Sequence, residues 1–130
     1  MQHIRRIVVI TLLAAAAFIP LQGGAAEVAF GPKLFTELLD AGKPVVVHFH
    51  SRWCGTCRQQ AKVLTLLLQD EAFKDITVLR ANYGSEDELR KELNVNNRST
   101  LVTFKAGKEA ARSTGQTSKE EIEKILRAAL

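Results

Sequence analysis

The chain is poor in the residues that most often mark a binding or catalytic site. Its 130 residues include only two cysteines, three prolines, one tryptophan and one tyrosine. A tetrahedral zinc site takes four ligands, and no second cysteine pair is present to complete one. The sequence also lacks a glycine-rich phosphate loop, a Ser-His-Asp arrangement, internal repeats and low-complexity tracts. These absences direct attention to the two cysteines.

A strong excess of charge of one sign is also missing. Lys and Arg outnumber Asp and Glu by 18 to 14, which gives a formal net charge of +4. Loss of Arg5 and Arg6 with an N-terminal leader would lower this charge to +2. No cluster of lysines and arginines appears elsewhere, so we expect no nucleic-acid partner.

The one long apolar run lies near the N-terminus and is short for a membrane span. Residues 7–19 are almost entirely apolar, whereas a spanning helix takes about 20 residues. Basic residues precede the run, and the small residues Gly24-Ala25-Ala26 follow it. This is the pattern of a secretory signal peptide that is cleaved after Ala26. We therefore expect a periplasmic protein, with an uncleaved N-terminal anchor as the alternative.

Cleavage there divides the chain into a leader, residues 1–26, and one domain, residues 27–130. A domain of this size buries roughly 65% of its unfolded surface, enough for a single hydrophobic core. Apolar patterns and turn residues predict alternating elements: strands at 28–30, 45–50, 76–82, 101–105 and 109–112, and helices at 32–41, 54–69, after Ser85 and after Ser118. Ser85 and Ser118 each begin a Ser-x-x-Glu capping-box pattern. This order predicts an α/β domain with a central mixed sheet and helices on both faces.

Cys54 and Cys57 lie where the strand at 45–50 passes into the helix at 54–69. Residues three apart share a helix face, which brings their Cα atoms within the span of a disulfide. So small a ring constrains the unfolded chain little. Export would also place the pair in an oxidising compartment. A reactive dithiol therefore explains the pair better than a structural crosslink does.

The position of Cys54 at a helix N-terminus predicts its role. Backbone N–H groups and the positive end of the helix dipole stabilise a thiolate there, and Arg52 and Arg58 add positive potential. We predict that Cys54 is the nucleophile that forms a mixed disulfide and that Cys57 resolves it. Trp53 offers a flat apolar surface for a substrate chain, and ordinary packing is an equal alternative.

Two other interpretations of the cysteines stay open from the residues alone. His48 and His50 share one face of their strand, so Cys54, Cys57 and a histidine would suit copper or zinc. In the other interpretation the fold is a docking surface and the cysteines are idle. For the redox interpretation we expect no metal and no cofactor beyond the Cys54–Cys57 disulfide.

The sequence around the dithiol resembles the thioredoxin family. Residues 46–57, VVHFHSRWCGTC, match the strand and active-site motif of that family, and residues 99–108 match its later hairpin. Gly115 falls where the family has a glycine before its last helix. The resemblance covers nearly all of residues 27–130. It implies the thioredoxin fold and a thiol–disulfide oxidoreductase that acts on protein disulfides, as a monomer.

With a leader, the chain is similar to periplasmic thioredoxin-like reductases. The resemblance then implies that electrons arrive from a membrane-embedded donor and pass to secreted proteins. It favours a reductase over an oxidase. The sequence itself does not give the direction, because the direction depends on reduction potentials.

Three positions depart from the family pattern. Thr56 stands where proline is frequent, which alters the rigidity of the helix start and the redox poise. His48 replaces a buried aspartate, and the resemblance implies that it accepts the Cys57 proton, with simple packing as an equal alternative. Ser99 aligns with the cis-proline of the family.

The third departure predicts a changed loop opposite Cys54. A cis bond before a non-proline residue costs ~3 kcal/mol, so we expect a trans Arg98–Ser99 bond. The Ser99 hydroxyl would then donate to the Cys54 thiolate, and Arg98 would lower the pKa of Cys54. Arg98, Ser99 and Thr100 are thus predicted substrate-binding residues, with a solvent-facing arginine and a turn serine as the alternative.

Overall fold

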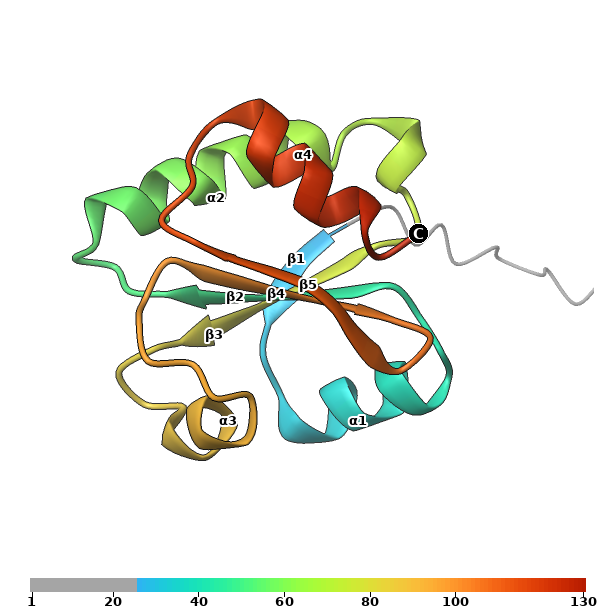
Figure 1. Ribbon diagram of the computed structural model, residues 1–130, viewed down its shortest axis with the longest axis horizontal. Helices are drawn as coiled ribbons and strands as arrows, with labels where there is room; N and C mark the ends of the chain where they lie inside the picture. The colour runs from blue at the N-terminus through green and yellow to red at the C-terminus, as the bar shows by residue number, and fades with distance from the viewer. Residues whose placement is uncertain (1–25) are drawn as a thin grey trace, which may run out of the picture.

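Five strands form one mixed sheet in the order β1-β3-β2-β4-β5. The computed structural model describes residues 26–130 (Figure 1). β1 and β2 run parallel to β3, whereas β4 is antiparallel to both β2 and β5. The strands are β1 (Ala26–Ala29), β2 (Val45–His50), β3 (Thr77–Asn82), β4 (Thr100–Lys105) and β5 (Lys108–Thr114). The predicted mixed sheet is confirmed.

Helices cover both faces of the sheet, as predicted. In Figure 1, α2 (Gly55–Leu67) and α4 (Lys119–Arg127) lie on one side of the strands. On the other side lie α1 (Pro32–Asp40) and α3 (Asp87–Glu92). A short 3-10 turn at Glu71–Phe73, which the sequence patterns did not predict, connects α2 to β3.

The central strand β2 is buried on both sides because its residues alternate between two hydrophobic cores. Val46 packs with residues of α2 and α4, while Val45, Val47 and Phe49 pack with residues of α1 and α3. All four side chains are fully buried. Each such burial contributes roughly 1.5–3 kcal/mol. This packing fixes the C-terminal end of β2, which leads into the turn before Cys54.

Two helix starts show how far the capping patterns hold. Ser118 is the N-cap of α4 and accepts a hydrogen bond from the Glu121 N–H at 3.2 Å. Ser85, by contrast, does not cap α3. Asn82 organises that turn instead: its carbonyl accepts from the Ser85 and Glu86 N–H groups, and its side chain accepts from Gly84. Glu86 therefore becomes the N-cap, with no side-chain cap bond.

The structure differs from the predicted elements in two further respects. β1 begins at Ala26, earlier than predicted, so one residue of the proposed leader lies in the sheet. The rest of that leader, residues 1–25, lies outside the described residues. Leu66, predicted to belong to the packing face of α2, is 57% exposed because that face is narrower than the apolar pattern suggests. No helix within residues 26–130 is long and apolar enough to cross a membrane.

Candidate active site

The dithiol lies at the junction between β2 and α2. After His50 the chain makes a turn in which the Cys54 N–H donates to the Ser51 carbonyl at 3.0 Å. Cys54 is the N-cap of α2, and its Sγ accepts a hydrogen bond from the Cys57 N–H at 3.2 Å. The sulfur therefore occupies the place where a helix offers unpaired N–H groups and a positive dipole end. Both cysteines are in the free thiol state.

The two sulfurs have unequal environments. Cys54 is half-buried, and this burial works to raise its pKa. Hydrogen bonds from Cys57 and Ser99, together with the charge of Arg98, outweigh burial and bring the pKa of Cys54 below its ordinary value. Cys57 is fully buried, and burial together with the neighbouring Cys54 raises its pKa. The outer sulfur thus favours the thiolate and the inner sulfur the thiol.

Ser99 lies against both sulfurs. Its Oγ is 3.1 Å from Cys54 Sγ and 3.1 Å from Cys57 Sγ. The Arg98–Ser99 peptide bond is trans, as are the other bonds of residues 26–130. Ser99 has a φ of 62°, in the left-handed region that a non-glycine residue seldom adopts. Such a conformation persists only where the surroundings enforce it.

Three backbone contacts hold Ser99 in this conformation. Its N–H donates to the Phe49 carbonyl at 2.9 Å, and its carbonyl accepts from the Gly115 N–H at 2.9 Å. The same carbonyl accepts from Gln60 Nε2 at 3.0 Å. The loop before β4 is thereby fastened to β2, to α2 and to the segment after β5.

A buried polar chain runs behind the dithiol. Gln60 donates its second amide hydrogen to the Gln116 carbonyl at 2.9 Å, so its oxygen faces His48 Nε2 at 3.1 Å. His48 Nδ1 faces the Glu27 carboxylate at 3.5 Å, and Glu27 also pairs with Arg80. Burial works to raise the pKa of Glu27, but the contacts of its carboxylate with His48 and Arg80 prevail and lower it.

His48, the predicted acceptor of the Cys57 proton, does not point at Cys57. His48 is fully buried, as a replacement for a buried acid should be, yet its ring nitrogens face Gln60 and Glu27. The Cys57 thiol is instead hydrogen-bonded to Ser99 Oγ, with the Phe49 carbonyl farther away at 4.0 Å. His48 therefore makes no hydrogen bond to Cys57 in this structure, and transfer of the Cys57 proton to it would need an intervening water.

The rim of the site contains the other predicted residues. Trp53 is 80% exposed, and the Arg52 guanidinium lies 5.3 Å from its ring centroid. Arg98 is exposed in a groove that Ser99, Thr56 and Gly115 also line. Trp53 and Arg98 are thus open to a substrate.

Thr100, predicted to bind substrate, is buried. Its hydroxyl donates to the Asn97 carbonyl at 2.7 Å and lies 2.9 Å from Thr114 Oγ1. The side chain is therefore occupied in holding the loop before β4 against β5. It presents no free polar atom to a substrate.

Two residues of this site had not been singled out from the sequence. Gln60 and Glu27 take their importance from partners that lie far away in the chain. One local signal was available for Gln60, a polar residue one turn after Cys57 on the buried side of α2. For Glu27 the sequence offers no such signal, because its partners come from β2 and β3.

The structure gives no support to a metal site. Within residues 26–130, no three His, Cys, Asp or Glu side chains gather as a metal ion would require. The nitrogens of His48, one of the two histidines considered, already face Gln60 and Glu27. The interpretation of Cys54, Cys57 and a histidine as copper or zinc ligands is therefore not supported.

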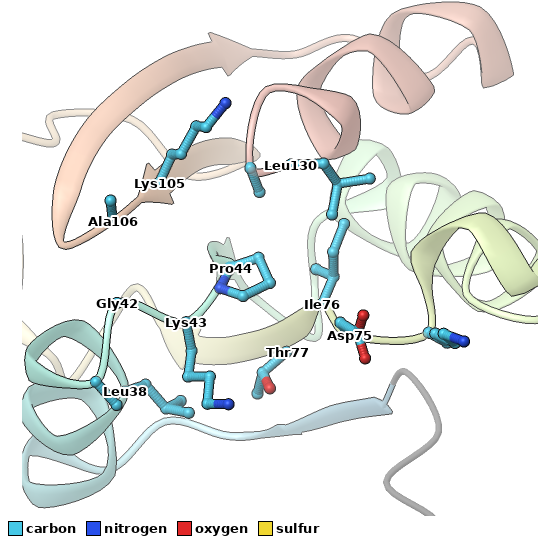
Figure 2. A pocket seen from close by; sticks show the side chains of 13 residues that line it. Leu38, Gly42, Lys43, Pro44, Asp75, Ile76, Thr77, Lys105, Ala106 and Leu130 are labelled. Atoms are coloured by element: carbon cyan, nitrogen blue, oxygen red, sulfur yellow. The ribbon is translucent and has the colours of Figure 1, made fainter.

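A hollow of about 990 Å³ lies at the opposite end of β2 from the dithiol. Figure 2 shows the residues that line it, among them Lys43 and Pro44 before β2, Thr77 at the start of β3, and Lys105 and Leu130. Neither cysteines nor histidines line it. It is separate from the redox chemistry.

Comparison with known sequences and structures points to a single protein family. The family model described as Thioredoxin matches residues 28–128. The chain is 33% identical to a thioredoxin of Alicyclobacillus acidocaldarius over 89 residues, which covers 68% of this chain and 84% of that protein. Among solved structures, Trxlp from Edwardsiella tarda has a TM-score of 0.75 at 29% identity, covering 78% of this chain and 98% of that one. Mitochondrial thioredoxin 3 of Saccharomyces cerevisiae, with a TM-score of 0.66 at 23% identity, shares the fold over 79% of this chain and 93% of that one.

Proposed function

The chain belongs to the thioredoxin family and is a thiol–disulfide oxidoreductase, and from this premise we propose that it is an exported reductase of protein disulfides. Protein disulfides are the general substrates of the family. The export, the direction of electron flow and the roles of individual residues are the proposed parts.

The contrast between the two cysteines is the observation that carries the proposed mechanism. Cys54 is the more accessible sulfur, with a lowered pKa, and Cys57 is the buried sulfur, with a raised pKa. The Cys54 thiolate attacks a substrate disulfide, forms a mixed disulfide and releases one substrate thiolate. Cys57 then loses its proton and attacks Cys54 Sγ, releasing the second thiolate. The protein becomes a disulfide, and the substrate gains two electrons and two protons.

The rim residues fit the docking of a protein chain. Trp53 presents an exposed aromatic face beside Cys54, and Arg98 presents a cation on the other side, next to Ser99. Aromatic faces of this kind add apolar contact at little entropic cost. Behind the dithiol, the buried residues His48, Gln60 and Thr100 position the loop before β4, which contains Ser99.

An insulin reduction assay with a chemical reductant tests the enzyme. We expect turnover by the wild-type protein, its loss in Cys54→Ser, and accumulation of a mixed disulfide in Cys57→Ser. Activity that survives both substitutions would contradict the roles assigned to the cysteines. Trapping with Cys57→Ser in a cell extract would also identify the protein substrates.

The reduction potential tests the direction. A dithiol near about −270 mV, the value of thioredoxin, fits a reductase, whereas a value near about −120 mV fits an oxidant. Hydrogen bonds that stabilise the Cys54 thiolate favour the reduced dithiol and so raise its reduction potential. We therefore expect a potential above that of thioredoxin, but closer to about −270 mV than to about −120 mV. A membrane-embedded electron donor is proposed to keep the dithiol reduced.

Export is proposed from the pattern of residues 1–26. We expect protein recovered from the periplasm to begin at Glu27 by mass spectrometry. Recovery of the full chain from the membrane fraction would favour the uncleaved anchor instead. Recovery of the full chain from the cytoplasm would remove the proposed export.

A further inference from the structure

Ser99 Oγ is equally distant, at 3.1 Å, from the two sulfurs that exchange charge during turnover. We propose that the Ser99 hydroxyl is a catalytic group that donates its hydrogen bond to Cys54 in the dithiol and transfers it to Cys57 in the mixed disulfide. This inference rests on the proposed order of attack by the two cysteines. It assigns to one side chain a part in both halves of the reaction.

In the dithiol, one arrangement of hydrogen atoms satisfies all three groups. A hydroxyl donates one hydrogen bond and accepts up to two. Either atom can be the donor in each of the two contacts of Ser99 Oγ. Because Cys54 is the sulfur that favours the thiolate, we assign the Ser99 hydrogen to Cys54 and the Cys57 S–H to Ser99 Oγ. The Cys57 N–H gives Cys54 a second donor. The nucleophile is thus stabilised as an anion while the resolving thiol stays protonated.

Formation of the mixed disulfide removes the acceptor that held the hydroxyl. Cys54 Sγ no longer has a negative charge, and Cys57 must now become the thiolate. The Phe49 carbonyl near Cys57 is itself an acceptor and cannot stabilise that charge. Within residues 26–130, the Ser99 hydroxyl is then the side-chain donor in contact with Cys57 Sγ, and the Ser51 backbone also favours the thiolate there. Rotation about one C–O bond redirects its hydrogen to that sulfur.

The resolving step then balances as follows. The Cys57 proton leaves to solvent, and its thiolate attacks Cys54 Sγ. The Cys54–Cys57 bond forms, the bond from Cys54 to the substrate sulfur breaks, and the electron pair leaves as a substrate thiolate that takes a proton from water. Ser99 keeps its own proton throughout, and only its hydrogen-bond partner changes.

The backbone around Ser99 suits a hydroxyl that must turn while its Cβ stays fixed. The Phe49 carbonyl, the Gly115 N–H and Gln60 Nε2 hold the peptide groups on both sides of Ser99. The side chain is 4% exposed, so water does not compete freely for the hydroxyl. The charged or titratable groups nearest this centre are Arg98 in the same loop, the Cys54–Cys57 pair itself, and His48 with Glu27 behind Gln60.

Single-turnover kinetics with dithionitrobenzoate test the proposal. Attack by Cys54 releases the first coloured thiolate, and resolution by Cys57 releases the second. Ser99→Ala keeps the Cβ and removes only the oxygen. Because hydrogen bonds to charged groups are strong, we expect Ser99→Ala to slow both releases, the second by about tenfold or more. Ser99→Thr, which retains a hydroxyl, is expected to recover most of the second rate.

Two further variants separate chemistry from packing. Ser99→Gly removes the hydroxyl and also relieves the positive φ, so it should reproduce the slow second release even if Ser99→Ala folds poorly. Ser113→Ala removes a buried hydroxyl that has no hydrogen-bond partner among the described residues, and both rates should stay unchanged. A second readout is the pKa of Cys57 in protein alkylated at Cys54, which should rise when Ser99 becomes alanine.

The outcomes separate this inference from the proposed function. A normal second release in both Ser99→Ala and Ser99→Gly would overturn the transfer, even if the first release slows. Equal slowing in Ser99→Ala and in a Ser99→Thr variant that matches the wild-type free energy of unfolding would also overturn it, because a retained hydroxyl would then make no difference. If the wild-type protein releases no thiolate, or Cys54→Ser behaves as wild type, the proposed order of attack has failed instead.

Discussion

Gln60 fixes the orientation of the His48 ring beneath the dithiol. Both amide hydrogens of Gln60 go to backbone carbonyls, those of Ser99 and Gln116, at 3.0 and 2.9 Å. Only its oxygen is left to face His48 Nε2, at 3.1 Å, so that nitrogen is the donor. His48 Nδ1 is thereby directed at Glu27. One neutral side chain thus connects the β1–β2 side of the molecule to the loop that contacts the sulfurs.

Replacing Gln60 with leucine should destabilise the protein. Gln60→Leu leaves the buried His48 Nε2 without its partner, and an unpaired buried polar group costs about 1–3 kcal/mol. The variant also removes one of the two donors to the Ser99 carbonyl and the donor to the Gln116 carbonyl. We expect the free energy of unfolding in urea to fall by about 2 kcal/mol or more. Gln59→Leu, at the exposed neighbouring position, is the matched control and should change the free energy of unfolding little. Equal effects of the two variants would contradict the importance of the buried chain.

The reaction of Cys54 with an alkylating agent should depend on pH in a defined direction. Only the thiolate reacts, and the pKa of Cys54 is lowered. The rate should therefore stay high below the ordinary thiol pKa, about 8.5, and decline as the pH falls through the lowered value. Arg98→Gln should move the midpoint upward and slow the reaction at pH 6 about two- to fivefold at low salt. Lys124→Gln, on α4, should leave the profile unchanged. A midpoint that is the same in Arg98→Gln and in the wild type would show that Arg98 does not lower the pKa of Cys54.

Trp53 should affect protein substrates and little else. Its side chain is 80% exposed, so Trp53→Ala should change the free energy of unfolding by less than about 0.5 kcal/mol. We expect insulin reduction to fall several-fold, while the rate with dithionitrobenzoate stays near that of the wild type. Leu66→Ala, at an exposed apolar residue on α2, is the control and should alter neither activity. Loss of the small-substrate reaction in Trp53→Ala would point to damage at the dithiol rather than to docking.

The two serines with the same capping pattern should respond differently to substitution. Ser118→Ala removes the hydrogen bond to the Glu121 N–H and should cost about 1 kcal/mol of unfolding free energy. Ser85→Ala removes no cap, since Asn82 organises that turn, and should be nearly neutral. Thermal or urea unfolding of the pair gives the comparison. A loss at Ser85 as large as that at Ser118 would contradict the structure.

The sequence was most informative where the determining interactions are local. The continuous apolar run of β2 and the helical spacing of α2 and α4 predicted those elements within a few residues. The spacing of Cys54 and Cys57 at a strand-to-helix junction predicted the dithiol chemistry. The capping pattern failed at Ser85, because residues 82–86 form a turn around Asn82 and α3 begins one residue later than the pattern places it, with Glu86 as its N-cap.

The remainder of the site depends on tertiary contacts that no local pattern records. Gln60 meets Ser99 and Gln116, which are 39 and 56 positions away in the chain. The alignment placed Ser99 opposite Cys54, but its equal distance from both sulfurs depends on its positive φ and on contacts with Phe49 and Gly115. Thr100 was predicted to bind substrate, whereas its hydroxyl contacts the Asn97 carbonyl and Thr114 within the fold.

The contacts of Glu27 limit where the proposed signal peptide can be cleaved. Its carboxylate pairs with Arg80 and faces His48, and its backbone belongs to the edge strand β1. Under the proposed processing after Ala26, this residue becomes the first of the secreted polypeptide. A peptidase that cut one bond later would discard the counter-ion of Arg80 along with part of that edge. If the proposed export is correct, accurate trimming is thus coupled to the integrity of the polar chain behind the dithiol.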